Sequence, residues 1–432
     1  MRETVVVEQD VSEAGLSPGV MEALGALAGV AREGLLALSV GVGLGVLAEL
    51  MEEEVTEVVG PRGRHDPGRS AVRHGRDQGE VTLGGRRVAV ERPRVRATDG
   101  SGEVPVGVYQ HFAGRDVLEQ VVSERVLASV SMRRYQSTNE PVGSDVTRQE
   151  RSTSKSAVSR VFIERTRTAL GELMARRLDD VRLAVLMLDG IDLKERTHIV
   201  CLGITTQGVK IPLGLWEGST ENATIATALL ADLVERGLDP EQGILFVLDG
   251  GKALRKAVRS VFGEAALVQR CIRHKERNVT DHLPERDRPA VRRRLRAAWA
   301  LDDHAQAQRR LETLAGELEL THPGAGASLR EGLDETITVQ HLRVTGSLKR
   351  TLSSTNPVES MIEIVRKTQR NVKRWQHGDM ALRWTAAGMS QAERQFRKIA
   401  GYKHLAPLVA RIERQQPRPQ QTTKEAATLI TV

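Results

Sequence analysis

Cysteine is nearly absent from the 432-residue sequence, which contains Cys201 and Cys271 alone. So low a content argues against a framework of structural disulfides and indicates a reducing compartment. The amino terminus has no signal-peptide pattern, and we therefore expect a cytoplasmic protein. Aromatic residues make up 3% of the chain. The remaining composition is that of a soluble globular protein of roughly two to four domains.

Long hydrophobic runs are also missing. The longest covers the 15 residues from Gly34 to Ala48, is rich in glycine and is flanked by charged residues. A helix that crosses a bilayer needs roughly 20 apolar residues. The run therefore predicts a buried or dimer-forming helix in the amino-terminal region, residues 1–58, and no membrane partner.

Acidic residues do not balance the basic ones, and the net charge is +7. Much of the excess lies between Pro61 and Arg96, where ten arginines accompany four acidic residues. A local excess of this kind suits a polyanionic partner. Biased base composition of the genome would also raise the arginine content, and this remains an alternative.

Within the basic stretch, residues 80–90 alternate in polarity on both sides of Gly84-Gly85. That pattern is the signal of a β-hairpin. We predict a small basic β element in residues 59–110, with Arg86 and Arg87 as candidates for DNA contact.

Three helices are expected in residues 111–180, beginning near Val117, Met132 and the serine-rich segment at Ser152. Hydroxyl side chains favour the start of the third helix, which carries Lys155 and Arg160 outward. Short helices with basic residues in the first turns are similar to a helix-turn-helix, whose last helix lies in the major groove of DNA. An ordinary helical linker is the alternative.

From residue 181 the pattern changes to apolar strands and amphipathic helices. Strands are expected at 183–193, 197–205, 209–216, 243–248 and 266–270, and helices at 223–237 and 253–262. The order βββαβαβ is that of an RNase H-like mixed sheet, an α/β core in which the first and fourth strands are neighbours. We expect this core in residues 181–275 and 346–400, an all-helical insertion in 276–345 and a polar tail in 401–432.

Three acidic residues stand at informative positions. Asp189 and Asp249 end apolar strands and precede glycine, and Glu359 lies in the first turn of a predicted helix. Three such carboxylates are able to hold a pair of divalent metal ions that act on a phosphodiester. Two have a structural alternative: Asp249 as a helix N-cap, and Glu359 as part of a capping arrangement with Asn356. Asp192 competes with Asp189 but would lie on the opposite face of the strand, and we prefer Asp189.

The segment Cys271-x-x-His274 has the spacing of half a zinc site, but no second pair supplies the four ligands of a structural zinc centre. We therefore favour a buried thiol, with His274 near the acidic residues. The neighbours Lys275, Arg277 and Asn278 are candidates for phosphate contact, or form an ordinary solvated face.

The helix that follows Glu359 carries Glu363 and several basic residues at spacings of three, four and seven, which place them on one face. This face fits DNA laid along the helix behind a metal ligand, or equally a ladder of surface ion pairs. The candidates for DNA contact in the whole chain are Arg86, Arg87, Lys155, Arg160, Lys252, Arg277, Arg366, Lys367, Arg370 and Lys373.

Four blocks together resemble a known family. They are Leu188-Asp-Gly190, Leu248-Asp-Gly-Gly-Lys-Ala-Leu254, the segment from Val268 to Asn278 that contains Gln-Arg-Cys-x-x-His-Lys-x-x-Asn, and Ser354-Thr-Asn-Pro-Val-Glu-Ser360. Their order, residue types and spacing are similar to those of Mutator-type bacterial insertion-sequence transposases, over about residues 60–400.

The resemblance implies a DDE transposase with an RNase H-like core. Asp189, Asp249 and Glu359 would be catalytic and would bind two Mg²⁺ ions, with Mn²⁺ able to substitute, while Cys271, His274, Lys275, Asn278 and Asn356 belong to the family blocks. A metal-activated water would cut the transposon ends, and the 3′ hydroxyls would attack target DNA. The partners implied are double-stranded DNA, with its terminal inverted repeats, and at least a second copy of the chain, in the nucleoid of a bacterium. A catalytically silent, transposase-derived DNA-binding regulator is the alternative.

Overall fold

A computed structural model describes residues 34–64, 66, 68–193, 196–218, 223–375 and 378–415. The chain divides into two compact units, Met1–Phe162 and Ile163–Val432, which are considered separately. The expectations for residues 1–33 and for the end of the tail, residues 416–432, lie outside the described residues.

The first unit is built around the predicted hairpin. Strands β1 (Ala71–Leu83) and β2 (Arg86–Ala97) pair antiparallel, with Leu83 opposite Arg86 across the turn. Gly84 occupies that turn with φ 53°, a conformation that glycine adopts at little cost. The short strand β3 (Glu103–Val104) joins the outer edge of β2. The expected β element is therefore confirmed.

Helix α2 (Leu35–Val59) matches the predicted amino-terminal helix. Its second half is buried against the hairpin, where Met51 and Val55 pack with Val81 and Val95. Its first half exposes apolar side chains, including Leu35. Among the described residues α2 is the one helix long and apolar enough to cross a membrane by length and composition, a test that core helices and signal sequences also pass. The absence of a membrane partner remains a prediction.

The helices after the hairpin follow the expectation in part. Helices α3 (Gly107–Ala113), α4 (Asp116–Leu127), α5 (Ser144–Gln149) and α6 (Lys155–Ala175) are formed. The prediction of a helix from Met132 is wrong: this segment consists of turns and the short 3₁₀ helix η1 (Gln136–Thr138). Its Tyr135 is fully buried and donates a 3.0 Å hydrogen bond to the carbonyl of Gly85, which ties the segment to the hairpin turn.

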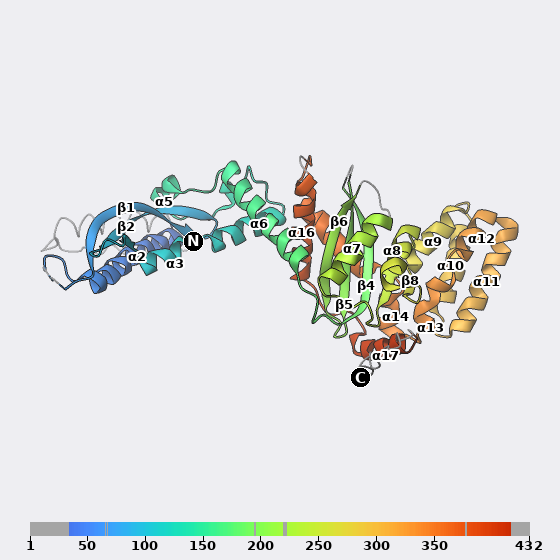
Figure 1. Ribbon diagram of the computed structural model, residues 1–432. Coiled ribbons are helices and arrows are strands. Elements are labelled where there is room, and N and C mark those ends of the chain that lie inside the picture. Colours follow the sequence, from blue (N-terminus) through green and yellow to red (C-terminus); the bar gives the residue numbers. More distant parts are fainter. Residues whose placement is uncertain are drawn as a thin grey trace, which may run out of the picture. The chain divides into compact units, whose positions relative to one another are not determined.

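The second unit contains a five-stranded mixed sheet (Figure 1). In chain order its elements are β4 (Leu183–Leu193), β5 (Arg196–Thr205), β6 (Lys210–Gly218), α7 (Ala223–Glu235), β7 (Leu245–Leu248), α8 (Lys252–Phe262) and β8 (Leu267–Arg270). The strands lie in the order β6-β5-β4-β7-β8. The first three are antiparallel, whereas β4, β7 and β8 are parallel. The predicted order of elements and the predicted pairing of the first and fourth strands are confirmed.

Both faces of this sheet are covered, because successive side chains of a strand point to opposite faces. On one face Val185 and Met187 pack in a core shared with α15 (Asn356–Gln369), α16 (Gly378–Glu393) and α17 (Leu405–Gln415). On the other, Leu186 and Leu188 pack with α7 and α8. Strand β4 is thus apolar throughout until it reaches its acidic end, which fixes the position of Asp189.

Between β8 and α15 the chain forms a layer of helices, in which residues 279–337 share a core of their own while Val339 and Leu348 pack in the core of the sheet. The helices are α9 (Ile272–Asp281), α10 (Arg288–Ala300), α11 (His304–Thr321), α12 (Pro323–Arg330), η2 (Asp334–Ile337), α13 (Thr338–His341) and α14 (Gly346–Leu352). The backbone N–H of Ile272 donates to the carbonyl of Ser353 at 3.0 Å, so the two ends of this layer meet at the sheet.

Candidate metal centre and the cleft beside it

The sheet brings two aspartates to the same edge. Leu188 and Leu248 are partners in the parallel pair β4-β7, and Asp189 and Asp249 are the residues that follow them. Oδ1 of Asp189 accepts a 2.9 Å hydrogen bond from the N–H of Gly190, and Oδ1 of Asp249 accepts one of 2.7 Å from the N–H of Gly251. The N-cap of α8 is Gly251, so Asp249 is not the N-cap residue that the alternative reading required.

The turn after Asp249 depends on glycine. Gly250 has φ 107°, and a Cβ atom at this position would lie 2.1 Å from Nε of Arg270. Arg270 is itself buried on the neighbouring strand β8, where it donates a 2.9 Å hydrogen bond to the carbonyl of Glu331. The guanidinium therefore packs directly behind the backbone that carries Asp249.

Glu359 lies in the first turn of α15, whose N-cap is Thr355. The hydroxyl of Thr355 donates a 2.6 Å hydrogen bond to Oε1 of Glu359. The proposed capping arrangement with Asn356 as N-cap is not formed, and no side chain caps this helix. The carboxylate is held by a side chain, and it faces His274, whose Nδ1 lies 4.0 Å from Oε1.

Cys271 and His274 approach the same carboxylate. Ligand atoms of Cys271, His274 and Glu359 all lie within 4.8 Å of one another. The hydrogen bond with Cys271 raises the pKa of His274 to about 9, against the effect of burial. Burial opposes ionisation of Cys271, yet hydrogen bonds from His274 and Thr355 hold its pKa below the usual value. The charges of Asp189 and Asp249 raise the pKa of His274 as well, which favours a role for this side chain in balancing the acidic charges.

The three carboxylates act on one another. Burial raises the pKa of Asp189 to about 6, against the N–H of Gly190, and the charges of Asp249 and Glu359 raise it further while His274 lowers it. A metal cation would add to the compensation that His274 gives these clustered carboxylates. Their oxygen donors are those that Mg²⁺ and Mn²⁺ prefer, so the donor set fits these ions. Asp192 stands apart, exposed and bonded to Thr197.

Arg86 and Arg87 are buried, and their prediction as DNA contacts is wrong. Arg86 lies 3.0 Å from Glu150 and donates to the carbonyl of Glu140. Arg87 donates to the hydroxyl of Thr82 and to backbone carbonyls at 2.7 Å. A side chain whose donors are used inside the fold has none left for phosphate, and both arginines instead fasten the hairpin to the segments around it.

Lys275 is likewise buried, and a phosphate contact by this residue is excluded. Its Nζ donates to the carbonyls of Ser328 and Glu331 at the end of α12. Lys252 is largely exposed at 3.7 Å from Glu331. The other predicted basic residues and Asn278 are exposed: Lys155, Arg160, Arg277, Arg366, Lys367, Arg370 and Lys373.

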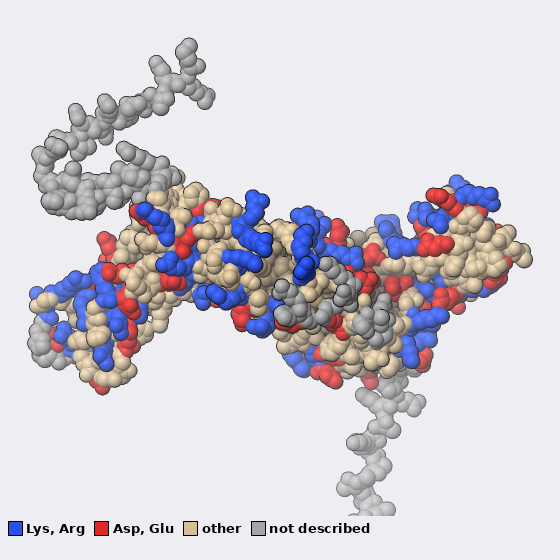
Figure 2. Space-filling view, turned by 90° about the horizontal axis from the view of Figure 1, so that it is seen from above, with Lys and Arg blue, Asp and Glu red and all other residues tan. Residues whose placement is uncertain are grey.

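The basic face of α15 contains part of the predicted ion-pair ladder, and its role in DNA binding stays a prediction. Lys367 pairs with Glu363 at 2.8 Å, which is one step of an ion-pair ladder. Arg366 on this helix and Arg370 at its C-cap are exposed. In the view of Figure 2, lysine and arginine side chains are interspersed with acidic ones over the surface, so basic charge is not confined to one patch there.

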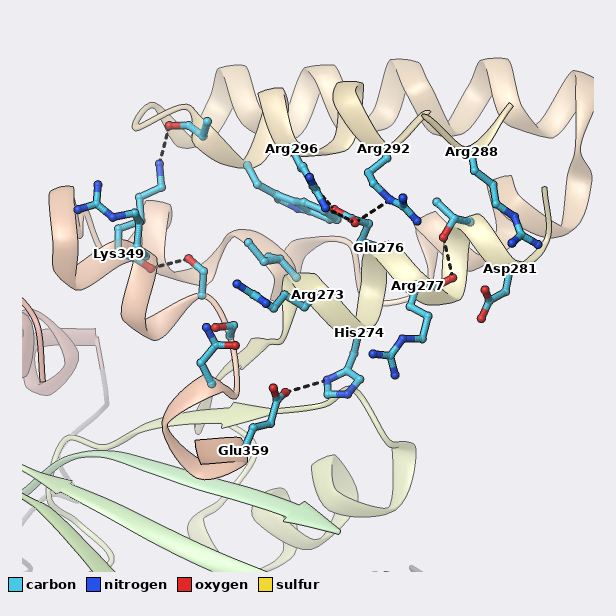
Figure 3. A pocket seen from close by; sticks show the side chains of 18 of the residues that line it. Arg273, His274, Glu276, Arg277, Asp281, Arg288, Arg292, Arg296, Lys349 and Glu359 are labelled. Carbon is cyan, nitrogen blue, oxygen red and sulfur yellow. Dashed lines mark hydrogen bonds and ion pairs between the residues drawn. The ribbon is translucent and has the colours of Figure 1, made fainter. Parts of the chain in front are cut away.

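A cleft of about 920 Å³ begins at His274 and Glu359 and runs between α9, α10 and α14 (Figure 3). Seven lysine and arginine side chains and four carboxylates line it, which makes it basic. Sequence reasoning did not identify this cleft, although Arg288, Arg292 and Arg296 recur at intervals of four on α10, a spacing that places them on one helical face.

Comparison with known protein families assigns the chain to one of them. The family model described as Transposase, Mutator family, matches residues 34–398, and the chain therefore belongs to this family of transposases. The resemblance inferred from the four blocks is confirmed.

Individual relatives agree with this assignment. The chain is 30% identical over 198 residues to the transposase for insertion sequence element IS6120 of Mycolicibacterium smegmatis, which covers 44% of this chain and 60% of that protein. It is 28% identical over 202 residues to a probable insertion-sequence transposase of Corynebacterium diphtheriae, 46% of this chain and 57% of that protein. The chain is 26% identical over 355 residues to the transposase for insertion sequence element ISRM5 of Rhizobium meliloti, a match that covers 79% of this chain and 84% of that protein. The chain thus spans somewhat more than half the length of the first two relatives.

Proposed function

We propose that the protein is a metal-dependent DDE transposase that binds the terminal inverted repeats of its insertion sequence, cleaves the transposon ends and transfers the 3′ ends to target DNA. The observation that carries the proposal is the convergence of Asp189, Asp249 and Glu359 from two strands and a helix. The strand order β6-β5-β4-β7-β8 supports an RNase H-like core, and membership of a transposase family supports DNA as the substrate.

Asp189, Asp249 and Glu359 would hold two Mg²⁺ ions, or Mn²⁺ in their place. When bound, such a pair activates the attacking oxygen and stabilises the leaving oxygen of a phosphodiester. The chain prepares this site in advance. Backbone N–H groups fix one oxygen of each aspartate, and Thr355 fixes Glu359, so that the carboxylates are oriented before substrate arrives. The cationic ring of His274 limits their mutual repulsion.

The exposed basic residues of the first unit and of α15 are proposed to contact the inverted repeats and the flanking DNA. Because two transposon ends must be held together during strand transfer, we propose a homodimer or a larger assembly, acting on the nucleoid in the bacterial cytoplasm. Binding should weaken steeply with salt, as expected when phosphate contacts release counterions.

The test is cleavage of DNA that carries the element's own inverted repeats, in Mg²⁺. Asp249→Asn should abolish cleavage and strand transfer while DNA binding is retained, because the amide removes a metal ligand and little volume. Asp192→Asn, an equal change three residues beyond Asp189 on the same strand, should leave cleavage intact. Cleavage by the Asp249→Asn protein at the parental rate would refute the three-acid centre. Parental protein that binds the repeats and never cuts them would instead be the DNA-binding regulator.

A further inference from the structure

We propose that the cleft between α9, α10 and α14 binds a single strand of DNA that leads away from the three acidic residues. The helical layer would then be a substrate-binding element and not a spacer between Asp249 and Glu359. This inference rests on the proposed function, since it assigns the path of the same substrate.

The cleft is continuous with the metal centre. His274 and Glu359 lie at one of its ends, and Arg273 and Arg277 project from the same helix as His274 (Figure 3). If the scissile phosphate of a strand lies at the carboxylates, the phosphates that follow it along the strand therefore lie near basic side chains. Long flexible arginines reach several positions of such a backbone.

The charges of the cleft divide into fixed and available ones. Arg292 and Arg296 both pair with the largely buried carboxylate of Glu276, at 3.0 and 2.7 Å. Lys349 donates to the carbonyls of Ala300 and Leu301 at the end of α10. Arg296 and Lys349 are thereby held against the walls, while Arg292 approaches Glu276 through Nε alone and stays partly exposed.

Three further arginines are free to bind phosphate. Arg273, Arg277 and Arg350 are exposed and line the cleft, and their guanidinium groups have no hydrogen-bond or ion-pair partner within the described ranges. Ser354 adds a polar group at the floor: it is 2% exposed, and its hydroxyl has no partner among the same residues. A buried hydroxyl without a partner is costly unless a ligand supplies one.

The size of the cleft selects one strand. A volume of about 920 Å³ lies at the upper end of the roughly 300–1,000 Å³ that enclose a drug-sized ligand. A space of this size suits a few nucleotides of a single strand better than a double helix. Single strands are held in the same way elsewhere, by a positively charged groove that follows the backbone.

The test compares two triple variants of the full chain. Arg273→Ala, Arg277→Ala and Arg350→Ala together remove the available charges of the cleft. Arg293→Ala, Arg309→Ala and Arg310→Ala remove the same charge from exposed positions of α10 and α11 that do not line it. Affinity for a labelled short oligothymidylate, and for a blunt duplex, is measured by fluorescence anisotropy at several salt concentrations without divalent metal.

The cleft variant should bind the oligothymidylate at least about 10-fold more weakly, and the slope of log affinity against log salt should fall by about 2, since each phosphate contact on a single strand contributes roughly 0.7. The control variant should keep the parental affinity and slope. Equal losses in both variants, or parental binding by the cleft variant, would overturn the inference. If the parental protein never cuts DNA in Mg²⁺ but the cleft variant loses strand binding, the cleft binds DNA and the proposed function is refuted. If the parental protein cuts DNA and the cleft variant binds the strand as well as the parent, the proposed role of the cleft alone is refuted.

Discussion

The hydroxyl of Thr355 donates a 2.6 Å hydrogen bond to Oε1 of Glu359, and Thr355 itself is fully buried. Thr355→Val keeps the shape of the side chain and removes the donor. Hydrogen bonds to charged groups contribute about 1.5–3 kcal/mol. We expect DNA cleavage by this variant to fall at least about 10-fold, and to need more Mg²⁺, because Glu359 is no longer held in place.

Thr355→Ser should restore most of that cleavage, because the hydroxyl returns. Thr351→Val on the preceding helix is the matched control, since its hydroxyl bonds the carbonyl of Ser347 and not a carboxylate. Cleavage rates measured across a Mg²⁺ titration distinguish the variants. An equal loss in Thr351→Val would mean that the effect comes from the fold and not from Glu359.

The raised pKa of Asp189 predicts how the stability of the metal-free protein depends on pH. Its pKa is about 6, above the ordinary value of 3.8, chiefly because of burial. Between these values the folded state binds more protons than the unfolded state, so stability falls as the pH rises through this window. The loss amounts to about 3 kcal/mol for a shift of this size.

Asp189→Asn should remove that loss and leave the metal-free protein more stable than the parent at pH 7. Thermal unfolding in a chelator, followed from pH 4 to 7, measures the effect. Addition of Mg²⁺ should stabilise the parent at pH 7 and not the variant. Asp192 is exposed on the same strand, and Asp192→Asn should therefore follow the parental curve. If Asp189→Asn also followed the parental curve, the buried carboxylate of Asp189 would not be the source of the pH dependence of stability.

Gly250→Ala tests the turn that carries Asp249. Both Gly250 and Gly263 have positive φ, 107° and 86°, so alanine strains either backbone by about 1–3 kcal/mol. At Gly250 the added Cβ also meets Arg270, whereas at Gly263 it meets open space. We expect Gly250→Ala to lower cleavage by about 100-fold through displacement of Asp249, and Gly263→Ala to retain it. Equal cleavage by the two variants at matched stability would contradict the contact with Arg270.

Arg86→Met tests the reassignment of a predicted DNA contact. The side chains of Arg86 and Glu150 are almost fully buried, and removal of one partner from a buried pair costs about 3–5 kcal/mol. Amide hydrogen exchange in β1 and β2 should therefore become faster. Arg96→Met, at an exposed position of β2, should leave exchange unchanged. Unchanged exchange in Arg86→Met together with weaker DNA binding would restore the original prediction.

The sheet could be predicted because the signals that mark its strands lie within short stretches of sequence. Apolar runs that end at Asp189 and Asp249 identify strands, and the intervening helical periodicity implies parallel neighbours, so the register that joins them follows from topology. The hairpin followed from Gly84-Gly85 in the same way. The blocks around Cys271 and Glu359 indicated the family. Local capping rules alone would have assigned Glu359 a structural role.

Burial of charge was not predictable. Arg86 and Lys275 carry the same charge in the sequence as Arg277, yet the first two are enclosed by carbonyl and carboxylate oxygens that come from distant segments. The helix predicted from Met132 failed for a similar reason. Tyr135 in this segment is held by a hydrogen bond to the carbonyl of Gly85, which lies 50 residues earlier. The cleft joins three helices separated in sequence, and its basic character is the sum of their facing sides.

The hydrogen bond between Ile272 and Ser353 brings the first and last residues of the helical layer together. Helices α9 to α12 and η2 share an apolar core of their own, whereas Val339 of α13 and Leu348 of α14 pack in the core of the sheet. Segments with adjoining ends tolerate insertion and exchange, because a change in their length does not move the flanking backbone. We therefore expect related chains to vary in length within α10 to α12 while Asp249 and Glu359 keep their separation, so that the proposed grip on DNA can change apart from the proposed chemistry.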